Sequence, residues 1–329
     1  SGFPQWVWSF GNFDGVHYLT IAETGYGLVE FVQVFFPLYP FLIRFLKPLF
    51  DGNYFASGLF IANACFLLVL FVFRRLLQKD MPTKNSNWVL LAMVVFPFSF
   101  FFGSIYTESI FLLLVLLSFY YAREKRWLLA GIFGALASAT RITGIFLLPA
   151  LLWEQYGETI LANVKKVQAV GYKKSVLVKT TLYTVRDVCM TPTTYIVPLG
   201  MAGYMLYLQL KFADFLYFWH VQPIFGAERS GSQLILPPQV LWRYAKIFFT
   251  ASPRQYNFWV ALWEVLSFLF AFTLLVIAHK RKIRLSYLIF SWFALLIPSF
   301  TGTFSSMPRY ILVIYPLYII LGTIKQKYI

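Results

Sequence analysis

The chain is short of acidic residues, histidine and cysteine. Asp and Glu number 13 in 329 residues, against 28 Lys and Arg, and there are 3 His and 2 Cys. Cys65 lies within an apolar run and Cys189 at the start of another, at different expected depths, so a disulfide is not expected. No spacing typical of a metal site is present, and neither is a glycine-rich phosphate loop or a nucleophile elbow. The common zinc, nucleotide and serine-hydrolase motifs are therefore missing.

Long apolar runs dominate the composition instead. Hydrophobic residues make up 59% of the chain and aromatic residues 21%, with a mean hydropathy of +0.67. The runs reach membrane-spanning length and do not alternate between apolar and polar residues, which favours helices over a closed barrel. We therefore predict an all-α, polytopic transmembrane protein. Nine spans are expected, at about residues 53–73, 87–105, 108–122, 127–140, 142–154, 188–210, 256–278, 284–301 and 309–324.

The Lys and Arg residues that give the chain its net charge of +15 are distributed unevenly between the two sides of the predicted topology. Nine spans place the two ends on opposite sides, and one side then carries 19 of the 28 Lys and Arg. By the positive-inside rule this basic side is cytoplasmic, and residues 1–52 are external. Because topology explains the charge, we expect membrane lipids and no nucleic acid as partners.

The predicted topology divides the chain into a first external loop, 1–52, and a transmembrane helical domain, 53–329. The domain has a cytoplasmic loop at 155–187, which is either a helix on the membrane surface or a solvated basic loop. Its external loop, 211–255, is rich in Trp, Tyr and Phe and carries Arg229, Arg243, Lys246 and Arg254. The chain starts with Ser1 directly before an external loop, so we expect a preceding helix or signal to be absent from it.

Residues 31–50 resemble a span in length but not in pattern. Three prolines interrupt the run, and Arg44 and Lys47 recur at helical spacing. Charges on an isolated spanning helix are costly, and proline breaks helices. We therefore predict a broken amphipathic segment in the outer membrane interface.

Two predicted spans, 109–122 and 127–140, are unusually short. Fourteen residues of helix extend about 21 Å, against a hydrocarbon core of about 30 Å. Their outer ends are therefore expected below the surface, where irregular backbone is tolerated mainly beside a cavity. Glu108 and Arg141 lie at these ends, so we expect both in one sunken region open to the outside.

Asp14 is a rare carboxylate on the predicted external side. An Asp-Gly pair favours a turn, so Asp14 suits the cap of a helix over residues 15–24 that Gly25 ends, with the His17 N–H as its partner. The functional alternative is a general base that deprotonates an acceptor hydroxyl at the membrane surface. The two roles are compatible, because a cap would hold the carboxylate in place.

Arg141 and Arg309 each lie near the end of a predicted span. A buried arginine is costly unless it finds an anion. A lipid-linked phosphate would supply one, since guanidinium binds phosphate through two hydrogen bonds. A structural ion pair, such as Arg141 with Glu108, is the alternative. His17 lies near Asp14, but these two residues and Glu23 supply too few ligands for a metal. Sugar stacking is an option for some of Tyr18, Tyr26, Tyr106 and Trp219.

Five motifs in order resemble the PIG-V-like mannosyltransferases, including the enzyme that adds the second mannose in GPI-anchor assembly. They are FDGVHYL at 13–19, FFPLYP at 35–40, YTES at 106–109, TRITG at 140–144 and PRY at 308–310. The resemblance covers most of the chain, with Phe13 where the family usually has Trp. It implies a GT-C fold, an inverting transfer from polyprenyl- or dolichyl-phosphate mannose, and Asp14 as the catalytic residue. It also implies that Tyr106, Glu108, Arg141 and Arg309 line the donor site, close to His17 and Tyr18.

One carboxylate is enough for this chemistry. An inverting glycosidase needs an acid as well as a base, but phosphate departs as a stable anion. Positive charge at the phosphate, from Arg309 and Arg141, replaces the acid. The scheme requires no metal cofactor and is compatible with a divalent cation.

We therefore predict a membrane hexosyltransferase with a lipid-linked or glycan acceptor. It would lie in a prokaryotic cell membrane or the endoplasmic reticulum membrane, with its active site on the non-cytoplasmic side. The alternatives are a lipid-linked oligosaccharide ligase or polymerase, and a lipid or sugar transporter. A transporter more often shows inverted repeats, and none is visible.

Overall fold

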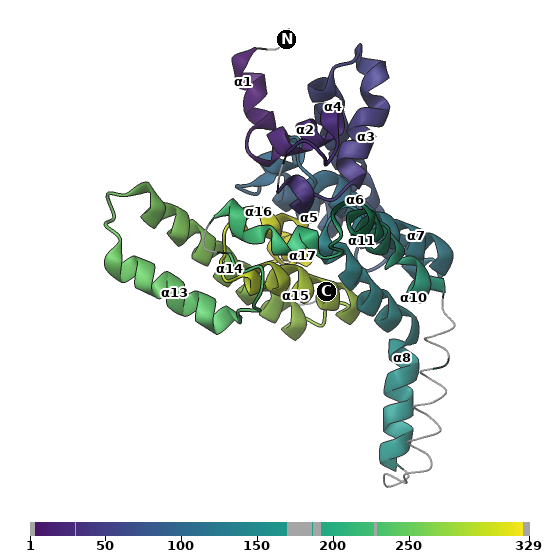
Figure 1. Ribbon diagram of the computed structural model, residues 1–329. Coiled ribbons are helices and arrows are strands. Elements are labelled where there is room, and N and C mark those ends of the chain that lie inside the picture. Colours follow the sequence, from purple (N-terminus) through teal and green to yellow (C-terminus); the bar gives the residue numbers. More distant parts are fainter. Residues whose placement is uncertain (1–3, 30, 170–185, 187–191, 227–228, 325–329) are drawn as a thin grey trace.

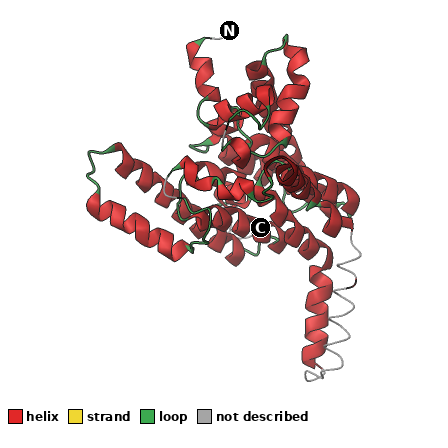
Figure 2. Cartoon of the chain, in the orientation of Figure 1, coloured by secondary structure: helices red, strands yellow, loops and turns green. Residues whose placement is uncertain are grey.

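The described part of the molecule is built from helices. A computed structural model describes residues 4–29, 31–169, 186, 192–226 and 229–324. Within these ranges the regular structure is helical and contains no strand (Figure 2). The all-α prediction is thus confirmed for the described residues.

The predicted first external loop folds into short helices at one end of the molecule (Figure 1). α1 (Gln5–Trp8) is followed by α2 (Asp14–Thr24), which ends at Gly25, a glycine at φ +76°. α3 (Leu38–Leu46) packs between α2 and α4 (Tyr54–Leu77). The Asn53 side chain caps α4 by accepting a hydrogen bond from the Ala56 N–H at 3.1 Å.

Residues 31–50 form a broken amphipathic segment, as predicted. α3 begins after Pro37 and continues into a 3-10 turn, Lys47–Phe50. It buries Tyr39 and Ile43 and exposes Phe41 and Arg44. The predicted location in the membrane interface stays a prediction.

Two helices among the described residues are long and apolar enough to cross a membrane. α4 has 24 residues and α14 (Tyr256–Lys280) has 25, so each extends about 36 Å or more. Shorter apolar helices are α7 (Trp127–Ser138) and the stretch formed by α15 (Leu285–Leu296) with the 3-10 turn that follows it. The count of nine spans stays a prediction.

Proline interrupts two stretches that were predicted as continuous helices. The predicted span 87–105 is instead α5 (Thr83–Val94) followed by a separate 3-10 turn, Ser99–Gly103. Pro97 has no N–H and disfavours helix at the residue before it, so α5 cannot continue. The predicted last span is likewise divided into α16 (Met307–Tyr310), a 3-10 turn, and α17 (Pro316–Gly322).

The region around the predicted cytoplasmic loop also differs from expectation. α8 (Leu147–Ala169) continues through the first half of that loop and projects from the body of the molecule (Figure 1). Most of the remaining loop, and Cys189, lie outside the described residues. The predicted span 188–210 is described from Pro192 as α10 (Pro192–Ile196) and α11 (Leu199–Phe212), which are separated near Pro198.

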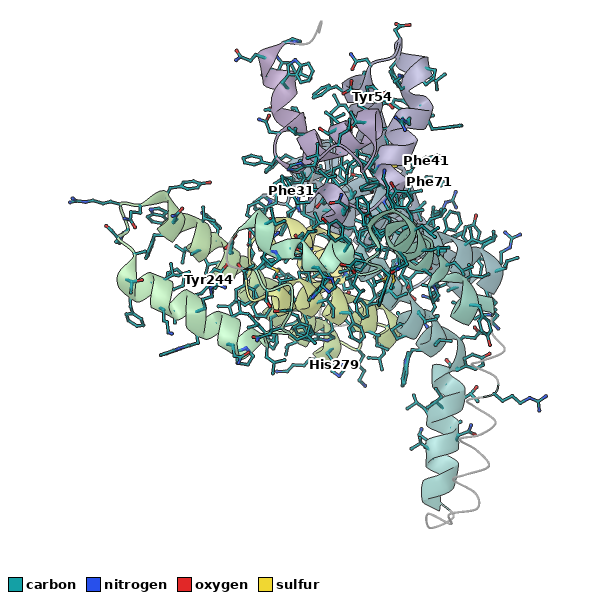
Figure 3. The ribbon with its side chains drawn as sticks, viewed as in Figure 1. Phe31, Phe41, Tyr54, Phe71, Tyr244 and His279 are labelled. Atoms are coloured by element: carbon teal, nitrogen blue, oxygen red, sulfur yellow. The ribbon has the colours of Figure 1, made fainter. Side chains whose placement is uncertain are left out.

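The predicted external loop 211–255 contains helices rather than irregular structure alone. α12 (Tyr217–His220) follows α11, and α13 (Pro237–Thr250) packs against α14 in a hairpin that projects from the body (Figure 1). Tyr244 of α13, labelled in Figure 3, donates to Glu264 of α14 at 2.6 Å. This bond ties the two arms of the hairpin together.

α6 (Glu108–Arg123) is the central helix of the body. It packs against α4, α7 and α8, and twelve of its 16 residues are buried. Its first residue is therefore held deep among other helices, and this residue is Glu108.

Candidate active site

Four charged side chains from four separate segments meet in a chain of ion pairs. Asp14 begins α2, Glu108 begins α6, Arg141 precedes a 3-10 turn at Ile142–Phe146, and Arg309 belongs to α16. Arg309 Nη1 donates to Asp14 Oδ2. Arg309 Nε lies 3.2 Å from Glu108 Oε1 without forming an aligned hydrogen bond, and Arg141 Nη2 donates to the same oxygen at 2.9 Å.

The turn that carries Asp14 is fastened to the segment before α6. Phe13 has a left-handed backbone, φ +56°, a conformation that is uncommon for a residue other than glycine. The Tyr106 hydroxyl donates to the Asn12 carbonyl at 2.9 Å, and the Ile105 N–H donates to the Phe10 carbonyl at 2.8 Å. These hydrogen bonds hold the turn in place, and Asp14 contacts Arg309 from this turn.

The charges in this chain of ion pairs balance. Glu108 is 0% exposed and Arg309 is 9% exposed, so an unpaired charge at either position would be costly. The Arg309 guanidinium lies 5.0 Å from the centre of the Tyr106 ring, and that of Arg141 lies 5.5 Å from the Tyr310 ring. Two carboxylates, two guanidinium groups and these aromatic faces stabilise one another.

Asp14 does not cap its helix, and that prediction was wrong. Asp14 is the first residue of α2, Phe13 is in the cap position, and no side chain caps this helix end. The nearby buried guanidinium of Arg309 binds the carboxylate instead, through a hydrogen bond in which both partners are charged. The ion pair between Arg141 and Glu108, one of two alternatives for Arg141, is present. A phosphate contact by Arg141 or Arg309 stays a prediction.

An amphiphilic cleft lies beside these ion pairs. It encloses about 1120 Å³ of space free of protein atoms, including its open mouth. Part of the wall is polar, and an apolar part comes from the segment before α3, from α12 and from the end of α15. The polar residues are Asp14, Tyr18, Thr140, Arg141, Thr143, Gln222, Arg229, Thr301, Ser305, Ser306 and Arg309.

Four of the seven predicted site residues line this cleft, namely Asp14, Tyr18, Arg141 and Arg309. The Tyr18 hydroxyl lies 3.4 Å from Thr107 Oγ1, next to the start of α6. Within the ranges that the structure describes, no three Asp, Glu, His or Cys side chains gather as a metal would require.

The other three predicted residues lie behind the cleft wall. Glu108 and Tyr106 contact the arginines, and the His17 ring stacks on Phe35 with centroids 5.0 Å apart. Burial lowers the pKa of His17, against the opposing effect of Asp14. Direct substrate contact by these three residues stays a prediction.

Sequence reasoning found only part of the contribution of the second external loop to the cleft. Trp219, one of the candidates for sugar stacking, lines the same cavity as Asp14, but so do Gln222 and Arg229, which were missed. The signal for Arg229 was the presence of cations in a loop on the side predicted to be poor in them.

Comparison with known families identifies the chain at the family level. Residues 38–312 match the sequence model of the DIE2/ALG10 family, a range that includes Glu108, Arg141, Arg229 and Arg309 and begins after Asp14. No curated protein and no solved structure matches the chain significantly. The match supports a GT-C-like glycosyltransferase but does not confirm the narrower PIG-V resemblance or the mannose donor. With most of its length matched, the chain belongs to the DIE2/ALG10 family, a family of membrane glycosyltransferases.

Proposed function

We propose that this protein transfers a hexose from a polyprenyl- or dolichyl-phosphate sugar to a lipid-linked or glycan acceptor, with inversion at the sugar C1. The observation that carries the proposal is the amphiphilic cleft, which combines a carboxylate and guanidinium groups with an apolar wall. A polyprenyl-phosphate sugar has the same division into a charged head and an apolar chain. Family membership supports dolichol-linked substrates in a membrane.

Asp14 is the proposed general base. Its side chain is 28% exposed and lines the cleft, so an acceptor hydroxyl can reach it. As the hydroxyl oxygen forms its bond to C1, its proton passes to Asp14. The bond from C1 to the phosphate oxygen breaks on the opposite face, and its electron pair leaves with the phosphate. No protonated leaving group is needed, so the reaction does not require a second carboxyl as an acid.

The buried ion pairs place this base. Arg309 holds one Asp14 oxygen, while Glu108 compensates the charge of Arg309 from behind. Because these ion pairs already hold Asp14 in place, less free energy is needed to orient its carboxylate during the reaction. The apolar wall, which includes Phe35, Phe36 and Phe218, is the proposed contact for the first isoprene units.

A donor panel tests the function and the sugar together. Purified protein in lipid nanodiscs is incubated with dolichyl-phosphate mannose or dolichyl-phosphate glucose and a mixture of lipid-linked oligosaccharides. The motifs at the start of the chain predict mannose, whereas the DIE2/ALG10 family includes a dolichyl-linked glucosyltransferase. Labelled product from one donor supports the proposal and identifies the sugar. Movement of lipid between leaflets without any transfer would instead favour the transporter class.

The matched variants are Asp14→Asn and Asp51→Asn. Asp51 is an exposed carboxylate in the same predicted external loop and does not line the cleft. Transfer should disappear in the first variant and persist in the second, with both proteins folded. Full transfer by Asp14→Asn would remove Asp14 from the role of base.

A further inference from the structure

The three arginines of the cleft differ in their partners. Arg309 is bound to Asp14 and Glu108, and Arg141 is bound to Glu108. The Arg229 side chain forms no hydrogen bond or ion pair with any residue in the described ranges, although it lines the same cleft. An arginine that faces a cavity without a partner is available for an anionic ligand.

The backbone around Arg229 is anchored to the 3-10 turn that follows α15. The Ser230 N–H donates to the Thr301 carbonyl at 2.8 Å, and the Ile235 N–H donates to the Phe300 carbonyl at 3.0 Å. Thr301, Ser305 and Ser306 line the cleft together with Arg229. The guanidinium group is therefore accompanied by hydroxyl groups that also suit phosphate oxygens.

The neighbouring elements bring one acidic residue near Arg229, but within the described residues it forms no ion pair with Arg229. Asp14 and Glu108 compensate Arg141 and Arg309. Glu264 of α14 is the acidic residue whose charge acts on Arg229, but its two oxygens accept hydrogen bonds from the Tyr244 hydroxyl at 2.6 Å and the Ser306 N–H at 3.2 Å. Among the residues that line the cleft, the cations Arg141, Arg229 and Arg309 outnumber the single carboxylate, Asp14, which suits a phosphodiester with one negative charge.

The geometry of an inverting transfer separates the base from the leaving group. The base and the leaving oxygen lie on opposite faces of the sugar, and paired catalytic groups in inverting glycosidases are about 6.5–9.5 Å apart. Arg309 is in direct contact with Asp14, so a phosphate on Arg309 would lie beside the base. Arg229 shares the cleft with Asp14 but makes no ion pair with it. It is therefore the better located cation for the leaving group.

We propose that Arg229 binds the donor phosphate and that Arg309 is a positioning residue for Asp14. The proposed ligand is an isoprenoid phosphodiester, and this choice of ligand rests on the proposed function. The assignment differs from the sequence-based prediction, which gave the phosphate to Arg309 and Arg141.

Binding measurements with a sugar-free probe test the assignment. The affinity of the full chain in detergent micelles is measured by calorimetry for farnesyl phosphate and for the uncharged alcohol farnesol. Loss of a charged hydrogen-bond partner should make Arg229→Gln bind farnesyl phosphate about 10- to 100-fold more weakly, with farnesol binding unchanged. Arg229→Lys keeps the charge but not the planar fork and should fall between the two.

Matched variants separate the three arginines. Arg254 is an exposed cation of the same predicted external loop outside the cleft, so Arg254→Gln should bind both probes as the wild type does. Arg309→Gln should keep its affinity for farnesyl phosphate and lower kcat without raising the donor KM, whereas Arg229→Gln should raise the donor KM. Thermal unfolding checks that each variant is folded.

The outcomes distinguish this inference from the proposed function. If the wild type transfers sugar and Arg229→Gln binds farnesyl phosphate equally well, the inference is wrong and the function stands. Loss of phosphate affinity in Arg309→Gln alone would also overturn it. If the wild type prefers neither probe and uses no donor, the donor class and the inference fail together. If Arg229→Gln does not fold, Arg229→Lys is measured in its place. A Lys variant that binds farnesyl phosphate as tightly as the wild type, at both low and high salt, would count against the assignment.

Discussion

Two clusters of arginines and carboxylates occupy opposite regions of the molecule, and they differ in how completely their charges are satisfied. In the cluster at the predicted cytoplasmic end, Asp80 accepts from Arg123 at 2.7 Å and Glu154 accepts from Arg284 at 3.0 Å. The hydroxyl of Ser286 adds a further bond to Glu154 at 2.5 Å. Each of the four charged residues therefore has a partner of opposite sign, and hydroxyl groups reinforce the pairing.

The cluster at the candidate active site is less complete. Among the described residues Asp14 has one ion-pair partner and remains accessible from the cleft, and Arg229 lines the same cleft without an ion pair. A pocket also adjoins the cytoplasmic cluster, so neither a cavity nor a charge cluster identifies an active site by itself. The difference lies in the pairing of the carboxylates, since Asp14 contacts one arginine whereas Asp80 and Glu154 each contact two.

The largest expected effect separates the two clusters by catalysis. Asp14→Asn should slow sugar transfer by about 10²–10⁴-fold, since general-base catalysis contributes about that factor. Asp80→Asn in the cytoplasmic cluster should leave the transfer rate near that of the wild type. Initial rates with saturating donor measure both. Equal rate losses in the two variants would show that the clusters do not differ in function.

The second prediction concerns the buried charge at the centre of the active-site cluster. Glu108→Gln leaves two guanidinium groups with one carboxylate, so we expect a loss of about 3–5 kcal/mol in the free energy of unfolding. Denaturant titration in micelles gives the value. Glu124→Gln, at an exposed pair with Lys79, is the control and should leave the stability unchanged. A stable Glu108→Gln protein would mean that solvent or a ligand compensates the arginines.

The smallest expected effect comes from His17, which lies in the predicted external part of the chain. Burial lowers its pKa from 6.5, so the unfolded chain binds a proton more readily than the folded protein. Stability is therefore complete above pH 6.5 and declines as the pH falls through the lowered pKa. His17→Phe keeps the ring beside Phe35 and should reduce the acid sensitivity of the stability. An unchanged stability profile between pH 7 and pH 4.5 would contradict this role.

Features of the site that depend on residues close together in the sequence could be predicted. Asp14 begins a helix that ends at Gly25, as the Asp-Gly pair and the glycine indicate. Glu108 begins α6 and Arg141 follows the end of α7, and the two pair at 2.9 Å, in agreement with the one shared region expected for them. The depth of this region in a membrane stays a prediction. Pro97 also carried a local signal, which a pattern based on hydropathy alone overlooked.

Contacts between distant segments were not predictable in the same way. The helices within residues 211–255 were missed because they lack the continuous apolar run of a membrane span; α13 is amphipathic and packs its apolar face on α14. Arg229 could not be distinguished from Arg243 or Arg254 by sequence, since all three are cations of one loop.

The sequence by itself determined that the chain is helical and apolar, where several helices end, and that Asp14 begins one of them. These properties follow from hydropathy and from backbone preferences that act over a few residues. Only the tertiary structure decided that Asp14 meets Arg309, 295 residues away, and that Arg229 lines the same cleft without an ion pair to any residue that the structure describes. Which charges meet depends on how every intervening helix packs, because burial makes each unpaired charge costly and packing determines where the partners are found.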